Sequence, residues 1–242
     1  MAQMEEPAPA SVAVEWSRRI VAEYRSAALT SQLAHWMLQA VAPVDLIDEA
    51  LAIVGDEMNH AALGHDVVVA ARGTPALPAM NQRELQLPRD LSAPLEHDLL
   101  RATLGIFVLG ETVAVRLFKR LRQQCSVPIA RTALDTILAD EVRHRDFGWS
   151  TLEWLLSTPR APEYRSIIHN ELPGMLYAIA TGYGESVVGD VAVETALFPN
   201  AARAWGLMPV AEYRAAVRQC WQDDYTPRFA ALGITMPPPR TP

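Results

Sequence analysis

The chain is poor in several residue types that define common classes of protein. Its 242 residues include only two cysteines and one lysine, and no apolar run reaches the length of a membrane span. Two cysteines exclude a disulfide framework and a four-cysteine metal site. A net charge of −7 with no basic run argues against a nucleic-acid-binding surface.

The N-terminal stretch also lacks a recognisable targeting signal. The first eleven residues, MAQMEEPAPAS, are acidic and rich in proline and alanine. They have neither the basic start nor the apolar stretch of a secretory signal peptide, so we expect a soluble cytoplasmic protein. Half of the residues are hydrophobic, which is enough for a sizeable core, and we expect one domain over 1–242.

Helical periodicity dominates the chain, and strand signals are nearly absent. We expect four long helices at about 11–41, 45–72, 95–123 and 128–158, with a proline-marked connection at 73–94. That connection is long enough to cross the length of a helix bundle. The prediction is therefore an all-α fold with a four-helix bundle over about 11–158.

The residues after the bundle are expected to form a helical cover at about 160–235, over one end of it. We predict a fifth helix over 162–183 with a kink or break at Pro173, an irregular segment over 199–209, and a last helix over 210–232 broken around Pro227. Aromatic residues of this segment indicate an aromatic-lined cover: Tyr177, Phe198, Trp205 and Trp221.

Two short stretches repeat one polar pattern inside helices that otherwise look buried. GDEMNH at 55–60 and LADEVRH at 138–144 both contain Asp-Glu-x-x-His. Each Glu and His falls where the three- and four-residue spacing of the apolar residues calls for leucine. The first and third predicted helices each place one glutamate in the same way, and in the first helix Glu15 is an alternative to Glu23. The six residues expected to point inward are Glu23, Glu57, His60, Glu111, Glu141 and His144.

Four carboxylates in one core need compensation. Each is costly to remove from water, and the four repel one another. Two divalent cations would cancel the four charges, and Glu-x-x-His puts both side chains on one helix face, one turn apart, so that both can reach one ion. One glutamate from each of two helices plus Glu-x-x-His from each of the other two is the ligand set of ferritin-like di-iron and di-manganese proteins.

The pattern resembles the ferritin-like di-iron carboxylate superfamily. The doubled Glu-x(about 28–37)-Asp-Glu-x-x-His is similar to its dioxygen-activating branch, which includes p-aminobenzoate N-oxygenase and the bacterial multicomponent monooxygenases. DEVRH at 140–144 matches the Asp-Glu-x-Arg-His form of those oxygenases. The resemblance covers about residues 14–157. It implies a ferritin-like domain with two iron ions, or Mn/Fe or Mn/Mn, held by the six inward residues.

The resemblance has one departure and implies supporting roles for three further residues. Ile137 stands where the N-oxygenase has an extra histidine, which leaves six ligands, as in the aldehyde-deformylating oxygenases. Asp56 would hold His144, and Asp140 would hold His60, by accepting the second N–H of each metal-bound ring. Arg143 is expected either to pair with one of the two aspartates or to be a solvated surface residue.

Helical glycines raise the question of space near the metals. Gly55, Gly105 and Gly110 lie inside predicted helices, where glycine costs about 1 kcal/mol relative to alanine. They indicate either room for substrate and dioxygen or a close crossing of helices. We expect a hydrophobic substrate pocket beside Phe107 and Gly110.

The function expected is a di-iron oxygenase or oxidase. It would use dioxygen and an external electron donor to oxidise a small organic substrate by hydroxylation, N-oxygenation or aldehyde deformylation. The alternative is metal handling, as a ferroxidase, a peroxide scavenger or a di-manganese catalase. A second alternative is a non-catalytic helical module with one structural Zn²⁺. The six-residue set argues against it, because a single Zn²⁺ would need only four ligands. We expect no nucleic-acid or membrane partner and leave a homodimer open.

Overall fold

The structure is a computed structural model that describes residues 9–75, 80–185, 195 and 197–237. Within these ranges every regular element is helical, which confirms the all-α class. No helix among the described residues has the length and apolar character needed to cross a membrane.

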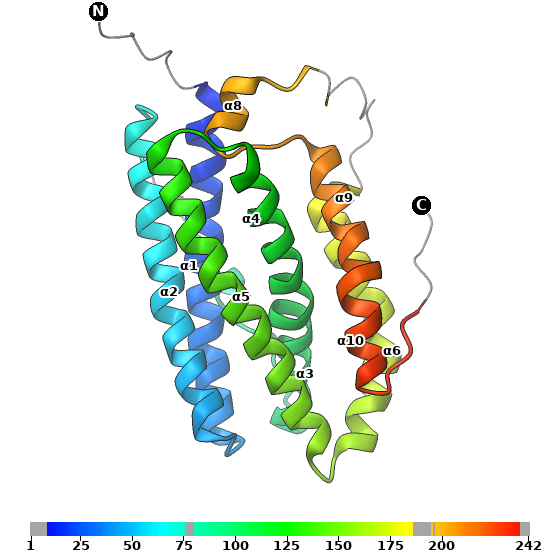
Figure 1. Ribbon diagram of the computed structural model, residues 1–242. Coiled ribbons are helices and arrows are strands. Elements are labelled where there is room, and N and C mark those ends of the chain that lie inside the picture. Colours follow the sequence, from blue (N-terminus) through cyan, green and yellow to red (C-terminus); the bar gives the residue numbers. More distant parts are fainter. Residues whose placement is uncertain (1–8, 76–79, 186–194, 196, 238–242) are drawn as a thin grey trace, which may run out of the picture.

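Four long helices lie side by side (Figure 1). The first, α1, spans Ala10–Gln39, and the second, α2, spans Val44–Ala70. The third is continuous and consists of α3 (Leu95–Ala102), a π-helical segment η2 (Thr103–Glu111) and α4 (Thr112–Gln124). The fourth, α5, spans Pro128–Ser157. The predicted helix bounds agree to within a few residues, but the π-helical segment was not predicted.

Prolines mark where these helices begin. Pro9, Pro43 and Pro94 directly precede α1, α2 and α3, and Pro128 lies in the first turn of α5. The fixed φ of proline suits the start of a helix, where its missing N–H would have no intrahelical partner in any case.

The long connection sets the direction of the third helix. α1 and α2 form an antiparallel hairpin, and so do α4 and α5. The chain leaves α2 at one end of the bundle, passes through the short helix η1 (Gln82–Leu85), and enters α3 at the opposite end (Figure 1). The Leu87 N–H donates to the Gln32 side chain of α1 at 2.7 Å, which fixes the connection to the bundle. α2 and the third helix therefore run in the same direction.

The C-terminal helices form a layer along the side of the bundle rather than a cover over one end, which corrects our expectation (Figure 1). The layer consists of α6 (Ala161–Ala180), η3 (Thr181–Glu185), α9 (Val210–Cys220), η4 (Trp221–Tyr225) and α10 (Thr226–Ala231). It packs on η2, α4 and α5 because these helices have a second apolar side. Of the described C-terminal helices, only the short helix α8 (Asn200–Ala204) lies at an end of the bundle (Figure 1).

Further details of the C-terminal prediction are corrected by the structure. The segment 199–209 was predicted to be irregular, but it contains α8. A kink or a break was predicted at Pro173; α6 continues through it without a break, and the kink stays a prediction. Tyr177 is 55% exposed and does not line a buried surface. Phe198, Trp205 and Trp221 are partly buried against the core. The fully buried aromatic residues of the described layer are Tyr164, Tyr225 and Phe229, and Phe229 packs on Trp149 of α5 with ring centroids 5.0 Å apart.

The C-terminal layer also hydrogen-bonds to the π-helical segment. Where a π-helix meets an α-helix the regular ladder is interrupted, and backbone carbonyls turn to other donors. The Tyr225 hydroxyl donates to the Leu109 carbonyl at 2.6 Å, and the Thr112 hydroxyl donates to the Val108 carbonyl at 2.6 Å. The Trp149 indole N–H of α5 donates to the Thr112 hydroxyl at 3.1 Å. Both the layer and α5 therefore hold η2 in place.

One glycine permits the close approach of α5 to η2. A Cβ added to Gly148 would lie 2.5 Å from the Phe107 Cβ and 3.0 Å from the Val108 nitrogen. At Gly55 and Gly105, by contrast, an added Cβ would meet nothing within 4 Å, so close helix crossing does not explain those two glycines. The described core is one continuous hydrophobic cluster, and the single domain over 1–242 stays a prediction.

We expect Gly148→Ala to lower the free energy of unfolding by about 1–3 kcal/mol, because the added methyl group forces α5 away from η2. Urea denaturation followed by circular dichroism measures the change. Gly174→Ala is the control: Gly174 is exposed in α6 and has open space around it, so that variant should be neutral or more stable by up to about 1 kcal/mol. Equal effects of the two substitutions would refute the packing argument.

Candidate metal centre

Six polar residues meet in the interior between the four long helices. α1 and the end of η2 each supply one glutamate, and α2 and α5 each supply Glu-x-x-His. All six were predicted to point inward, and all six are buried. Their exposed fractions are Glu23 7%, Glu57 1%, His60 1%, Glu111 9%, Glu141 3% and His144 0%.

Each histidine ring directs its Nδ1 atom toward two carboxylates. Nδ1 of His60 lies 3.7 Å from an oxygen of Glu23 and 3.7 Å from an oxygen of Glu57. Nδ1 of His144 lies 3.6 Å from Glu57 and 3.5 Å from Glu141. These separations are long for hydrogen bonds. They suit donors that share an ion, since two atoms each about 2.1 Å from an ion and about 110° apart are about 3.4 Å from one another.

The ligand atoms fall into two overlapping groups. One group combines Glu23 and His60 with Glu141, and the other combines Glu111 and His144 with the same Glu141, with atoms within 4.8 Å of one another in each group. The glutamate of α2 approaches both histidines. Two carboxylates thus lie between the groups, and the geometry offers places for two cations.

Four atoms of the cluster have no hydrogen-bond partner among the described residues. They are Nδ1 of His60, Nδ1 of His144, Oε2 of Glu57 and Oε2 of Glu141. A buried polar atom without a partner costs about 1–3 kcal/mol, and here two rings and two carboxylates carry that cost in one place. Cations bound between them would satisfy all four atoms, so the residues present fit a pair of metal ions.

The other nitrogen of each ring is hydrogen-bonded to an aspartate of the opposite helix. Nε2 of His60 donates to Asp140 at 3.0 Å, and Nε2 of His144 donates to Asp56 at 3.1 Å. These are the two contacts expected from the sequence. A carboxylate acceptor at Nε2 orients the ring and directs Nδ1 toward the carboxylates.

Arg143 links the two aspartates. Its Nη2 donates to Asp56 at 2.9 Å and to Asp140 at 2.8 Å, and its Nη1 donates to Glu49 at 3.1 Å. We expected a pair with one aspartate or none. Instead one guanidinium closes a chain of contacts from one histidine ring to the other, and its charge helps to lower the pKa of Asp140, opposing the effect of burial.

Two features near the cluster were not found from the sequence. The Ser26 hydroxyl donates to Oε1 of Glu57 at 2.8 Å and so orients that carboxylate. Ser26 lies three residues after Glu23 on α1, and this spacing on one helix face could have indicated it. Glu111 is the last residue of the π-helical segment, a kind of segment that often lies at functional sites. Nothing in the local sequence indicates that this segment is π-helical.

Burial has the largest effect on the pKa values of the clustered glutamates. It raises the pKa of Glu23 to about 8 and that of Glu141 to about 8, and neighbouring carboxylates add to both shifts. Burial and the charge of Glu141 raise the pKa of Glu111 well above its usual value. At Glu57 contacts with His60 and Glu23 outweigh burial, so its pKa is lowered. Burial opposes charge on His60, but contacts with Glu23 and Glu57 raise its pKa to about 11. Without cations the cluster therefore retains protons.

The expected substrate pocket beside Phe107 and Gly110 stays a prediction. Phe107 is fully buried and packs edge to face on Phe147, with ring centroids 4.8 Å apart. A Cβ at Gly110 would lie 3.4 Å from the Gly105 carbonyl oxygen, which is nearly ordinary contact.

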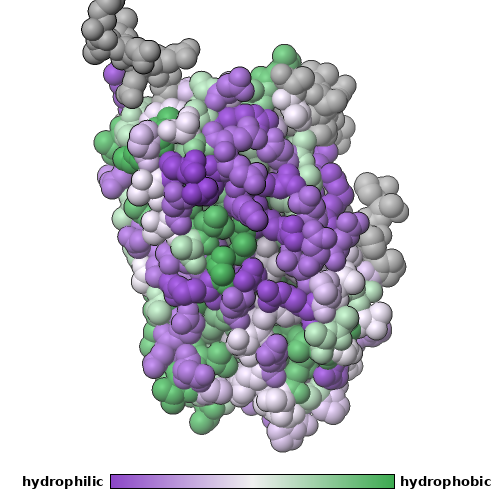
Figure 2. Space-filling view, in the orientation of Figure 1, coloured by the Kyte–Doolittle hydropathy of each residue, from purple (hydrophilic) through white to green (hydrophobic). Residues whose placement is uncertain are grey.

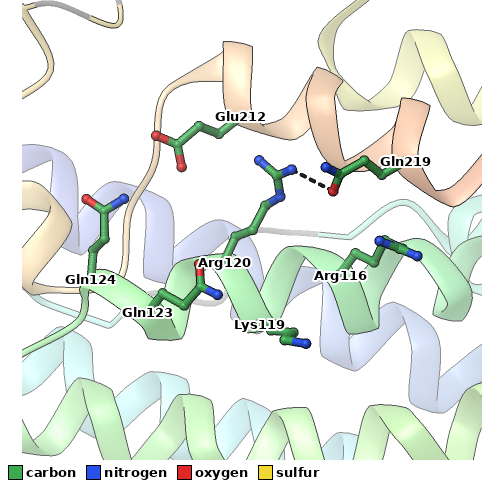
Figure 3. Close-up of a pocket in the computed structure, with 7 residues that line it drawn as sticks. All are labelled: Arg116, Lys119, Arg120, Gln123, Gln124, Glu212 and Gln219. Carbon is green, nitrogen blue, oxygen red and sulfur yellow. Dashed lines mark hydrogen bonds between the residues drawn. The ribbon is translucent and has the colours of Figure 1, made fainter. Parts of the chain in front are cut away.

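A polar pocket of about 480 Å³ lies elsewhere, between α4 and α9 (Figure 3). Arg120 donates across it to Gln219 at 2.7 Å, and Arg116 is paired with Asp223 and Asp224. None of the six clustered residues lines it. Three cations and one acid line this pocket, and the acid, Glu212, pairs with Arg203. We assign the pocket no part in the chemistry of the cluster.

Comparison of the chain with protein-family models, with curated proteins and with solved structures found no match. The case for a family therefore rests on the six clustered residues and on the two aspartates and one arginine that support them.

We expect the metal-free protein to lose stability as pH rises from about 5 to about 8. Glu23 and Glu141 have folded pKa values of about 8, above their ordinary 4.5, so over this window the folded state holds protons that the unfolded chain has released. The melting temperature of chelator-treated protein should fall by on the order of 10 °C. Glu23→Gln should reduce the fall, and a melting temperature that rises through this window would contradict the protonated cluster.

We expect Asp140→Ala to weaken metal binding by roughly 10–100-fold, because the ring of His60 loses the acceptor that orients it. Competition with a chromogenic chelator measures the affinity. The control is Asp146→Ala, on the same helix, where the side chain is about half exposed and its ion pairs among the described residues are with Arg145 and Arg228. An affinity that drops equally in both variants would point to general damage to α5.

Proposed function

We propose that this protein is a ferritin-like carboxylate enzyme with a two-metal centre that uses dioxygen to oxidise a small organic substrate. The observation that carries the proposal is the set of four buried ligand atoms, two imidazole and two carboxylate, that face one another without partners. A pair of cations is the simplest occupant for such a set of donor atoms.

The residues divide into two half-sites with shared carboxylates. Glu23, Glu57 and His60 would hold one ion, and Glu111 with Glu141 and His144 would hold the other. Iron, manganese or a mixed pair suits this set of oxygen and nitrogen donors. When bound, a redox-active pair of this kind supplies dioxygen-dependent oxidation.

The chain's own residues keep the centre neutral, oriented and dry. Asp56 and Asp140 hold the Nε2 protons, so that each ring presents a neutral Nδ1. Ser26 fixes one oxygen of Glu57. Apolar side chains within a turn or two of the ligands are fully or almost fully buried and exclude water from the site: Ile53, Leu104, Val108, Leu134 and Ile137.

The C-terminal layer supports an organic substrate over metal handling. It lies against η2, which ends in the ligand Glu111, and it packs Tyr183 close enough that the charges of Glu111 and Glu141 add to burial in raising the tyrosine's pKa. A centre that only oxidises metal ions has no need of such a covered apolar side. An external electron donor would restore the reduced state. Both cysteines are free and buried, which fits a reducing compartment such as the cytoplasm.

We expect two metal ions per chain when the protein is expressed with iron or manganese, measured by elemental analysis. Glu141→Ala should lower the content to one or none, because this carboxylate reaches both groups. Glu153→Ala, an exposed acid on the same helix, should leave it unchanged. Bound metal should also raise the melting temperature, since it binds only the folded chain. Full loading of the Glu141→Ala variant would refute the site.

We expect one round of iron oxidation per centre, followed by a halt until a reductant is added. A ferroxidase, the alternative function, consumes Fe²⁺ as its substrate, whereas an oxygenase spends oxidising power on an organic molecule. Stopped-flow mixing of the reduced iron-loaded protein with dioxygen, followed by excess Fe²⁺, separates the two. Sustained Fe²⁺ consumption with accumulation of ferric mineral would favour metal handling.

A further inference from the structure

α2 carries a second stripe of residues on the face opposite the core. Its positions alternate in steps of four and three along the whole helix, and every one of them is exposed. We call this stripe the outer seam. It consists of Val44, Asp48, Leu51, Gly55, Met58, Ala62, His65 and Val69.

The outer seam has the character of a helix-packing surface rather than of a solvated face. Its large apolar members are strongly exposed: Val44 73%, Leu51 53%, Met58 41% and Val69 52%. A seven-residue repeat of this kind lets two helices stay in contact along their length, and the seam is about 37 Å long at 1.5 Å per residue. A helix that is apolar on two opposite faces is normally covered on both. α2 lies at the edge of the bundle (Figure 1), and the outer seam is exposed among the described residues.

The face drawn in Figure 2 differs in character. Hydrophilic side chains predominate over its middle and right, with one small hydrophobic cluster near the centre. The middle and right of that face therefore show no long apolar stripe, although hydrophobic groups also appear along its left edge and lower part (Figure 2).

We propose that the outer seam is the surface through which two copies of this chain associate, with α2 packed antiparallel against α2 of the second copy. A two-fold axis through the middle of the seam brings together positions whose numbers sum to 113. All eight seam positions then pair within the seam, and none is left without a counterpart.

The pairs match in charge and in size. Asp48 faces the second copy's His65, so the two ionisable residues of the seam meet each other. Leu51 faces the second copy's Ala62, and Met58 faces its Gly55, so each large side chain meets a small one. The remaining pair is Val44 with Val69, at each end. A parallel arrangement would instead set Asp48 against Asp48 and Leu51 against Leu51.

A groove beside the outer seam fits the antiparallel arrangement. It has a volume of about 470 Å³ and lies between α1 and α2, lined by Ile20 and Tyr24 on one side and by Met58, Ala62 and His65 on the other. Because Leu51 of the second copy lies over Ala62, its side chain comes to the mouth of this groove. Asp45 and Asp66 flank the seam, but both are exposed, and solvent screens their repulsion.

Sedimentation equilibrium of the full chain tests the arrangement. We expect a dimer at micromolar concentrations and a dissociation constant raised by on the order of tenfold or more in Met58→Glu, because the charge would be buried in the seam. The control is Leu91→Glu, an equally drastic change at an 88% exposed residue outside the seam, which should leave the dimer intact. A monomeric wild-type protein, or a dimer unaffected by Met58→Glu, would overturn the proposal.

A charge exchange tests the direction of packing. Asp48→Arg sets arginine against histidine and His65→Asp sets aspartate against aspartate, so each should weaken the dimer several-fold. The double variant restores an opposite pair and should recover most of the wild-type affinity. Recovery is specific to the antiparallel pairing, so a double variant as weak as the two single variants would overturn it.

Discussion

The main physical constraint on this structure is the cost of burying four carboxylates in one space. Removing these groups from water raises the pKa of three of them, and the metal-free cluster must retain protons to exist. The surrounding residues do not neutralise it. They position it: two aspartates fix the imidazole rings, and a serine fixes one carboxylate. The fold thus gives up stability to keep these polar groups together, a cost that is expected where a binding or catalytic site takes priority over packing, as we propose here.

Arg143 connects the two aspartates that orient the histidine rings. It contacts both aspartates while remaining 45% exposed, so its charge is partly screened by water and its value lies in geometry more than in stability. A planar guanidinium can donate to two carboxylates in fixed directions, which a lysine cannot do. The two histidine rings, with centroids 5.8 Å apart, are therefore oriented by one shared network rather than independently.

The sequence predicts the elements and the inward residues well because both follow from one periodicity. Prolines set helix starts, and Glu57, His60, Glu141 and His144 interrupt apolar stripes at stripe positions, which is a local signal. The C-terminal layer was misplaced because its packing depends on a second apolar side of α4 and α5, and periodicity cannot choose between two sides of a helix. The π-helical segment was not predicted because it, too, depends on contacts that are distant in the sequence. It is stabilised by Tyr225 and Trp149, more than a hundred and nearly forty residues away.

The long connection between α2 and α3 has a consequence for assembly. It divides the bundle into two hairpins, each built from contacts close in sequence and able to form early. Each hairpin carries three of the six clustered residues, but the aspartates are exchanged. Asp56 of the first hairpin accepts from the imidazole of the second, and Asp140 of the second accepts from the imidazole of the first. Neither half can orient its own histidine while it is separate. The cluster is complete only once the two hairpins dock. The histidine rings can therefore reach their final orientation only after the whole bundle has formed.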